Sequence, residues 1–321
     1  MAPFIVWGVM ALVFNGWPQE FRILLATLYG LGSAAALIGF STRRALGGCM
    51  CLFAIPLACF ILMRPSLNRN WQPDVAEMPY AEINGNIVTL HHVRNAIYTE
   101  ATSAKVRYET RVYDLARLKS VDILFSDWGL NAVAHTMLSF GFEGEDYLCF
   151  SIETRREVGE AYSAIKGFFR QYELIYIAAD ERDAIRVRTN YRQGEDVYLY
   201  RLQVPSTGQI RDTFLDYMAR INALRHRPEW YNAVTDNCMT SGFRIIRKHA
   251  ASSRGDWHWS VILNGHAPAH AYATGALDTS LPFDELKRRS RINDQAQAAG
   301  DAPDFSVKIR EGMPGMEWTS K

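Results

Sequence analysis

Charged side chains are almost missing from the first 63 residues of this 321-residue chain. Only Glu20, Arg22, Arg43 and Arg44 carry a charge there. So long a stretch without charge is unsuited to a water-exposed surface and indicates a membrane segment. From residue 64 onward the composition is that of an ordinary soluble domain, and a chain of this length can bury a sizeable core.

The chain also lacks a dominant charge. Its net charge is +1, which gives no basic field for nucleic acid and no acidic tail. Cysteine is scarce, with five residues, and none has the Cys and His spacing of a zinc site, so we expect no metal and no other cofactor. Only Cys149 and Cys238 lie in the soluble part, and outside the cytoplasm they could form a disulfide.

Two uncharged apolar runs, residues 23–42 and 45–63, are each long enough to cross the roughly 30 Å core of a bilayer. Arg43 and Arg44 lie between the runs, so we expect a transmembrane helical hairpin whose turn is cytoplasmic. The chain then leaves the membrane on the opposite side. This topology predicts a catalytic or binding domain on the outer face, in the periplasm or extracellular space.

The remaining sequence predicts four further regions and an α+β fold class. Residues 3–14 are apolar but too short to span a bilayer. Residues 64–80, rich in Pro, Asn and Arg, predict a linker. Residues 81–281 carry alternating strand patterns and amphipathic helical patterns, and predict the folded domain. Residues 282–321 are polar and rich in Ala, Gly, Gln and Asp, and we expect a mobile tail.

The clearest hairpin is predicted from residues 134–142 and 147–154, on either side of Gly144. Alternation puts the large apolar side chains on one face and small or polar ones, including Cys149, on the other. A turn centred on Gly144 pairs His135 with Glu153, whereas a two-residue slip would place Ser151 or Arg155 there. We expect the helix that follows Cys238 to pack on the face of small residues.

Cys238 is predicted to lie in the first turn of a helix. Residues 235–237 (TDN) are all good N-cap residues, and residues 239–247 have helical spacing. The helix dipole and the free N–H groups of a first turn favour a thiolate and lower the thiol pKa from about 8.5. This position suits a nucleophile, although a small buried residue that packs at a helix start has the same pattern.

A thiol nucleophile needs a base within hydrogen-bond reach and a group that orients that base. Among the eight histidines, His135 is the best placed, because it starts a strand and faces a predicted carboxylate. The predicted catalytic residues are therefore Cys238, His135 and Glu153. The backbone N–H of Cys238 and three side chains are candidates for oxyanion stabilisation or support, namely Asn237, Ser151 and Thr240. The non-catalytic alternative is that His135 is a buried core histidine and that Glu153 forms an ion pair at the surface.

Several strings of the sequence resemble the "Lnb N-terminal periplasmic domain" family over roughly residues 68–245. They are residues 70–74 (NWQPD), 93–95 (VRN), 134–142 (AHTMLSFGF), 151–155 (SIETR), 167–174 (GFFRQYEL), 197–201 (VYLYR) and 237–240 (NCMT). The resemblance implies a circularly permuted papain-like, NlpC-type fold in which an antiparallel sheet packs on the helix with the cysteine. In such a permuted fold the histidine precedes the cysteine, as His135 precedes Cys238. Met239 departs from the family pattern, which more often has Thr there.

The family name points to bacterial lipoprotein N-acyltransferases. It implies transfer of an acyl chain from a phospholipid, through a Cys238 thioester, to the N-terminal amine of a lipidated lipoprotein cysteine, at the periplasmic face of the bacterial inner membrane. Arg64, Arg69 and Arg94 are then candidates for contacts with lipid head groups. Two alternatives remain open: a cell-wall peptidase or amidase of NlpC type, and a non-catalytic periplasmic module with a Cys149–Cys238 disulfide.

Overall fold

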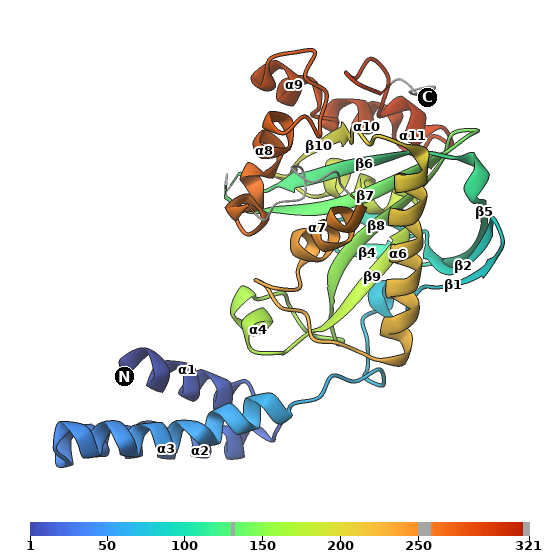
Figure 1. Ribbon diagram of the computed structural model, residues 1–321. Coiled ribbons are helices and arrows are strands. Elements are labelled where there is room, and N and C mark those ends of the chain that lie inside the picture. The colour runs from blue at the N-terminus through green and yellow to red at the C-terminus, as the bar shows by residue number, and fades with distance from the viewer. Residues whose placement is uncertain (130–131, 250–257, 317–321) are drawn as a thin grey trace.

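The N-terminal region consists of three helices that pack on one another (Figure 1), α1 (Ala2–Val13), α2 (Gln19–Gly39) and α3 (Thr42–Leu62). The computed structural model of the chain describes residues 1–129, 132–249 and 258–316. Both α2 and α3 are long and apolar enough to cross a membrane, and α1 is shorter. Many of their large apolar side chains point outward, with Ile38 87% exposed. An outward apolar surface of this kind suits lipid rather than water, as the predicted hairpin requires.

The soluble region is built on a mixed sheet with the strand order β1-β2-β9-β8-β7-β6-β10, and β5 pairs with β2. Neighbouring strands are antiparallel, except that β2 and β9 are parallel. A separate hairpin contains β3 and β4. The predicted α+β class is confirmed. The strands are β1 (Tyr80–Asn84), β2 (Ile87–Arg94), β3 (Ile97–Glu100), β4 (Ser103–Lys105), β5 (Tyr108–Asp114), β6 (Leu118–Asp127), β7 (Ala134–Phe142), β8 (Asp146–Arg155), β9 (Glu173–Ala179) and β10 (Asp196–Arg201).

Helices cover both faces of this sheet, so it has a core on each side (Figure 1). On the first face α6 (Thr207–His226), α7 (Cys238–His249) and α8 (Ala267–Ala273) lie over Leu138 and Phe150. On the second face α5 (Glu181–Ala184), α10 (Asn293–Ala299) and α11 (Phe305–Lys308) lie over Met137 and Cys149. The other helical segments are η1 (Pro73–Val75), η2 (Leu115–Arg117), α4 (Ala164–Phe168), the π-helical turn η3 (Val187–Tyr191), η4 (Trp259–Val261), η5 (Asn264–His266) and α9 (Phe283–Arg289).

The β7–β8 hairpin has the predicted register. Phe142 pairs with Asp146 and Met137 pairs with Ser151, so the same parity holds from the turn to the last pair. The turn contains Gly144 at φ 86°, a left-handed conformation that glycine adopts without steric cost. Continued by two residues, this register sets His135 opposite Glu153, as predicted.

The prediction that the Cys238 helix packs on the face of small residues is wrong. Helix α7 lies on the apolar face, where Ile245 shares a core with Leu138 and Phe150. The space above the small residues is filled by polar and charged side chains instead. Ser139, for example, donates a hydrogen bond of 2.5 Å to Glu181 on α5. The amphipathic helix therefore follows apolar burial, and small residues make room for a buried polar network.

The C-terminal segment is also more ordered than its composition predicts. Up to residue 316 it forms α9, α10 and α11, and Ile292 and Phe305 are fully buried in the second core. Arg310 lies in the same layer, where it bonds Asp122 at 2.9 Å and Glu181 at 2.6 Å. Residues 317–321 lie outside the described part of the chain. The polar composition wrongly predicts a mobile tail, because buried ion pairs as well as apolar contacts hold this segment on the domain.

The soluble region is in contact with the ends of the membrane helices. Phe169 stacks on Phe14 with ring centroids 5.4 Å apart, and Arg170 donates a hydrogen bond of 2.8 Å to the Phe60 carbonyl. Trp230 donates to the Met63 carbonyl at 3.3 Å. The predicted linker at residues 64–80 is itself bound along the domain, and η1 lies within it. These contacts hold the domain against the ends of the apolar helices.

Candidate active site

Cys238 is the first residue of α7, and Asn237 is the N-cap. The Asn237 Oδ1 accepts hydrogen bonds from the N–H groups of Met239 at 3.0 Å and Thr240 at 2.9 Å. Among the three candidate cap residues of the sequence, the one adjacent to the cysteine is therefore used. The cap thus bonds the N–H groups of the two residues after Cys238 and does not use the N–H of Cys238 itself.

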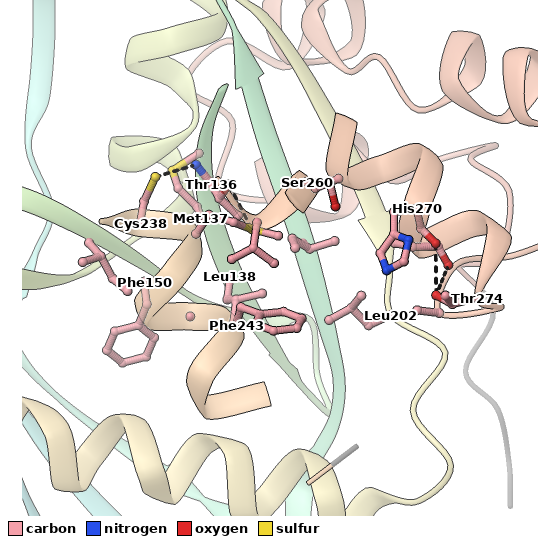
Figure 2. A pocket seen from close by; sticks show the side chains of 18 of the residues that line it. Thr136, Met137, Leu138, Phe150, Leu202, Cys238, Phe243, Ser260, His270 and Thr274 are labelled. Carbon is pink, nitrogen blue, oxygen red and sulfur yellow. Dashed lines mark hydrogen bonds between the residues drawn. The ribbon is translucent and has the colours of Figure 1, made fainter. Parts of the chain in front are cut away.

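The thiol lies where strands β7 and β8 separate. Their last pair is Met137 with Ser151, and Thr136 is the next residue of β7. The backbone N–H of Thr136 is directed at the Cys238 sulfur, 3.5 Å away (Figure 2). This contact lowers the thiol pKa, because a hydrogen bond to sulfur favours the charged form.

His135, Ser151 and Glu153 form a closed hydrogen-bonded group at the same position. The His135 Nε2 lies 3.1 Å from Glu153 Oε1 and 2.7 Å from Ser151 Oγ. The Ser151 hydroxyl in turn donates to Glu153 Oε1 at 2.7 Å. With that hydroxyl proton directed at the carboxylate, Ser151 accepts from a protonated Nε2. The predicted imidazole, carboxylate and thiol are thus brought together, and Ser151 is part of the imidazole–carboxylate link.

A fourth side chain of the group, Arg188, was not identified from the sequence. Its Nη2 lies 3.0 Å from Glu153 Oε1, and its Nη1 donates to the Ala184 carbonyl at 2.6 Å. Arg188 is buried and comes from the π-helical turn η3, a geometry that is frequent at functional sites. No motif marks one arginine among many in this stretch, so sequence reasoning had no signal for it.

The electrostatics of the group favour an ion pair between thiolate and imidazolium. Burial alone lowers the pKa of His135, but the charges of Glu153 and Cys238 outweigh it and raise that pKa to about 9. Burial raises the pKa of Cys238, but the charge and hydrogen bond of His135 overcome it and lower the pKa below its ordinary value. The pKa of Glu153 is held well below its usual range against burial, by His135 and Arg188.

Each candidate for oxyanion stabilisation has another hydrogen-bonding role. Asn237 caps α7, and its Nδ2 donates to the Ala233 carbonyl at 2.8 Å. The Thr240 Oγ1 accepts the Asn237 N–H at 3.0 Å, and Ser151 is bound to His135 and Glu153. The backbone N–H of Cys238 remains as the donor at the start of the helix. As oxyanion ligands Asn237, Ser151 and Thr240 are therefore not supported, because their polar atoms already have partners.

Two tyrosines that the sequence did not single out lie near the thiol. A side-chain hydrogen bond joins Tyr162 and Tyr231, and both interact electrostatically with Cys238. Burial and the neighbouring thiol raise the pKa of Tyr231, so its hydroxyl stays protonated. Tyr162 is 55% exposed. The thiol thus has neutral tyrosine hydroxyl groups as well as an imidazole among its neighbours.

An apolar cavity opens beside Cys238 (Figure 2). Its lining comes from β6, β7, β8, α7 and α8 and is mostly aliphatic or aromatic, with Met239 and Phe243 on the helix side. Cys238 lies at one end of the labelled residues in this view, and His270 and Thr274 lie at the other. Met239, the departure from the family pattern, also accepts a hydrogen bond of 3.7 Å from the Thr136 hydroxyl through its sulfur.

The structure differs from two other expectations. Cys149 and Cys238 are free thiols whose side chains lie in the cores on opposite faces of the sheet, so the alternative disulfide does not form. Arg94 is buried and bonded through two nitrogens to Asp183, at 2.8 and 2.9 Å, so it is not a head-group ligand. Arg69 is bound to acidic side chains of the domain, Glu157 and Glu173. Arg64 is exposed.

The described residues contain no group of three or more His, Cys, Asp or Glu side chains arranged to hold a metal ion. What they contain is a candidate nucleophile, a base and an orienting acid, in an α+β domain that follows two apolar helices. A family model described as "Lnb N-terminal periplasmic domain" matches residues 104–265, slightly more than half of the chain. The chain belongs to this family. The periplasmic domain and the two apolar helices fit a membrane protein with a periplasmic domain. No match was found among curated proteins or among solved structures.

Proposed function

We propose that this protein is a lipoprotein N-acyltransferase of the bacterial inner membrane, with a permuted papain-like catalytic domain on the periplasmic face. The observation that carries the proposal is the Cys238 sulfur beside His135, with Glu153 3.1 Å from the imidazole. A thiolate supported in this way is the nucleophile of acyl transfer. The acceptor, a lipidated N-terminal cysteine, is taken from the resemblance to Lnb-type acyltransferases.

In the first half-reaction the Cys238 thiolate attacks the ester carbonyl of a phospholipid. A carbon–sulfur bond forms, the carbon–oxygen bond of the ester breaks, and the His135 imidazolium gives its proton to the departing alkoxide. The products are an acyl thioester and a lysophospholipid. Glu153 keeps the imidazole oriented through Nε2, and the N–H of Cys238 stabilises the negative oxygen of the tetrahedral intermediate.

In the second half-reaction the free amine of the acceptor attacks the thioester carbonyl. His135, now neutral, takes a proton from the amine, a carbon–nitrogen bond forms, and the thiolate leaves. No oxidant, metal or further cofactor enters this balance. The amide product and the regenerated ion pair complete the cycle.

The apolar cavity beside Cys238 favours an acyl substrate over a cell-wall peptide. A cavity lined by Leu138, Phe150 and Met239 suits a hydrocarbon chain, whereas a peptide substrate needs hydrogen-bonding partners that these side chains do not offer. The two apolar helices also favour lipid substrates, because they hold the thiol where lipids diffuse. A peptidase with the same residues remains the competing function.

The test is mass spectrometry of lipoprotein N-termini in cells that lack their usual N-acyltransferase. Expression of this chain should add one acyl group to the N-terminal cysteine, and Cys238→Ala and His135→Ala should abolish the addition. Acylation that persists in Cys238→Ala would refute the thioester route. Cleavage of cell-wall peptides by the unmodified protein, without acylation, would support the peptidase instead.

A further inference from the structure

A second cavity lies between the residues that follow α3 and the segment that leads to Cys238. Its volume is about 690 Å³, within the range of small-molecule sites. Three arginines line it, Arg64, Arg170 and Arg227, together with Trp230 and the residues just before the catalytic helix. Arg64 follows directly on α3, and Trp230 is bonded to the Met63 carbonyl. With α3 as a membrane span, the cavity lies just beyond the end of that span, where head groups begin.

The acidic side chains that line this cavity are already neutralised by other arginines. Glu229 is bonded through both oxygens to Arg220, at 2.7 and 2.6 Å. Asp236 is bonded to Arg244 at 3.1 Å. Neither Arg220 nor Arg244 lines the cavity, so both acids have their hydrogen-bonded ion-pair partners outside it, and Arg227 acts on Glu229 only through its charge.

The charges of the lining arginines are therefore available to an anion. Within the described residues no ion pair involves Arg64 or Arg227. Arg170 donates to the Phe60 and Ile61 carbonyls, which are uncharged, so its positive charge is not neutralised. A cavity with this surplus of guanidinium groups attracts phosphate, whose geometry matches their forked donors.

We propose that this cavity binds the phosphate group of a membrane phospholipid. The proposal rests on the proposed function, for which it defines how the acyl donor is held. A phosphate between Arg64 and Arg227 leaves the glycerol ester on the side of Asn232, Thr235 and Asp236, the segment that runs into Cys238. The head group is then held in the polar cavity while the acyl chain enters the apolar one.

The experiment is calorimetric titration of the full chain carrying Cys238→Ala, in micelles of a nonionic detergent. The probes are dihexanoylphosphatidylglycerol, dihexanoylglycerol, which has the same chains without phosphate, and glycerol 3-phosphate, which has the phosphate without chains. We expect dihexanoylphosphatidylglycerol to bind about tenfold or more tightly than either other probe. Arg64→Gln and Arg227→Gln should each weaken it by about three- to tenfold, the effect of losing one partly exposed charge-assisted hydrogen bond.

The matched control is Arg288→Gln, which removes the same charge from α9, at the end of the molecule away from the membrane helices (Figure 1). It should bind all three probes as the parent does. Arg64 and Arg227 are both exposed, so their variants should unfold at the parent's temperature. Equal binding of dihexanoylphosphatidylglycerol by the parent and by the Arg64→Gln/Arg227→Gln double variant would overturn the proposal, and so would equal binding of dihexanoylglycerol. Glycerol 3-phosphate that binds as tightly as the lipid would mean a site for soluble phosphate esters and would refute the lipid assignment.

Failure of this site and failure of the acyltransferase function are distinguishable. Cys238→Ala has no nucleophile, so its binding does not depend on turnover. Phosphate-dependent binding by Cys238→Ala, without lipoprotein acylation by the unmodified protein, would support the site and reject the function. Acylation without a preference for the phosphorylated probe would reject the site alone.

Discussion

The Nε2 atom of His135 lies 3.1 Å from Glu153 Oε1, so one ring nitrogen is committed to the carboxylate. The other, Nδ1, is then the atom available to Cys238. This division fixes the tautomer and the direction of the imidazole. It also makes the charge of the pair depend on pH in a way that can be measured.

The first prediction concerns the reactivity of the thiol. Because the pKa of Cys238 is lowered and that of His135 is raised to about 9, the ion pair exists from the thiol pKa up to about pH 9. Iodoacetamide should alkylate Cys238 at a nearly constant rate between the thiol pKa and pH 8.5. In His135→Ala the alkylation rate should be lower than in the unmodified protein. It should also increase with pH over this whole range. Peptide mass spectrometry measures it site by site.

Cys149 provides an internal control for this experiment. Burial raises its pKa, so it should remain unlabelled in the folded protein at every pH tested. If Cys238 instead titrates like a free thiol, with a rate that rises tenfold per pH unit below pH 8.5, the ion pair is absent.

The second prediction concerns Glu153. Replacing it with Gln removes the charge that opposes burial, so the pKa of His135 should fall from about 9. The alkaline limit of the acyl-transfer pH profile should therefore move to lower pH, and the rate of acyl transfer should drop by about 10² or more. Ser151→Ala keeps the charge and should cause a smaller shift. An unchanged alkaline limit in Glu153→Gln would assign the raised pKa to another group.

The third prediction concerns Arg188 as a positioning residue. Without it, Glu153 loses a cation that holds its pKa below the usual range. In Arg188→Met the Glu153 carboxylate should therefore become protonated at a higher pH. The acid limb of the pH–activity profile should move to higher pH as a result. Arg188→Lys keeps the charge and should restore part of the activity. A purely structural role predicts equal loss of activity at all pH values in both variants.

The fourth prediction concerns the apolar cavity. Ala271 on α8 lines it, and Ala273 on the same helix is exposed and does not. Ala271→Leu fills part of the space and should shift the preferred acyl donor toward shorter chains by about threefold or more. Ala273→Leu, with the same added volume, should leave the preference unchanged. The preference is measured by mass spectrometry of the products when phospholipids of different chain length compete. Equal preferences in Ala271→Leu and Ala273→Leu would mean that the acyl chain does not bind in this cavity.

The fifth prediction concerns the C-terminal segment. Arg310 is buried and bonded to Asp122 and Glu181, which are fully buried. Arg310→Met leaves the Glu181 carboxylate without this partner and should lower the free energy of unfolding by about 3–5 kcal/mol. Thermal unfolding of the full chain in detergent measures the loss. Arg289→Met, which breaks a surface ion pair with Glu285, should change it by less than about 1 kcal/mol.

Local patterns predicted much of this structure. The β7–β8 hairpin and the helix at Cys238 follow from alternation, helical spacing and capping, which act between residues close in sequence. The pairing of His135 with Glu153 followed from the position of the turn at Gly144 and from the alternation of faces along the two strands. The approach of Cys238 to that pair was inferred from chemistry, since no local pattern brings residues 100 positions apart into contact.

What the sequence did not predict depends on long-range contacts between polar groups. Arg188 reaches Glu153 from a separate turn, and Arg310 reaches Glu181 from the end of the chain. Such pairs leave no periodicity, because a single charged residue looks the same whether water or a carboxylate surrounds it. The same ambiguity made Arg94 look like a surface residue and the C-terminal segment look mobile.

The contacts of Phe14 with Phe169 and of Met63 with Trp230 attach the soluble domain to two different helices, α1 and the end of α3. A single attachment would let the soluble domain rotate relative to the helices, and a second attachment prevents this rotation. The Cys238 sulfur is then kept at a fixed distance from the ends of the apolar helices. In the proposed acyl transfer, a substrate must present its reactive atom at this same distance. A lipid-anchored molecule keeps that distance while it diffuses laterally in the membrane, whereas a dissolved molecule reaches it only by chance.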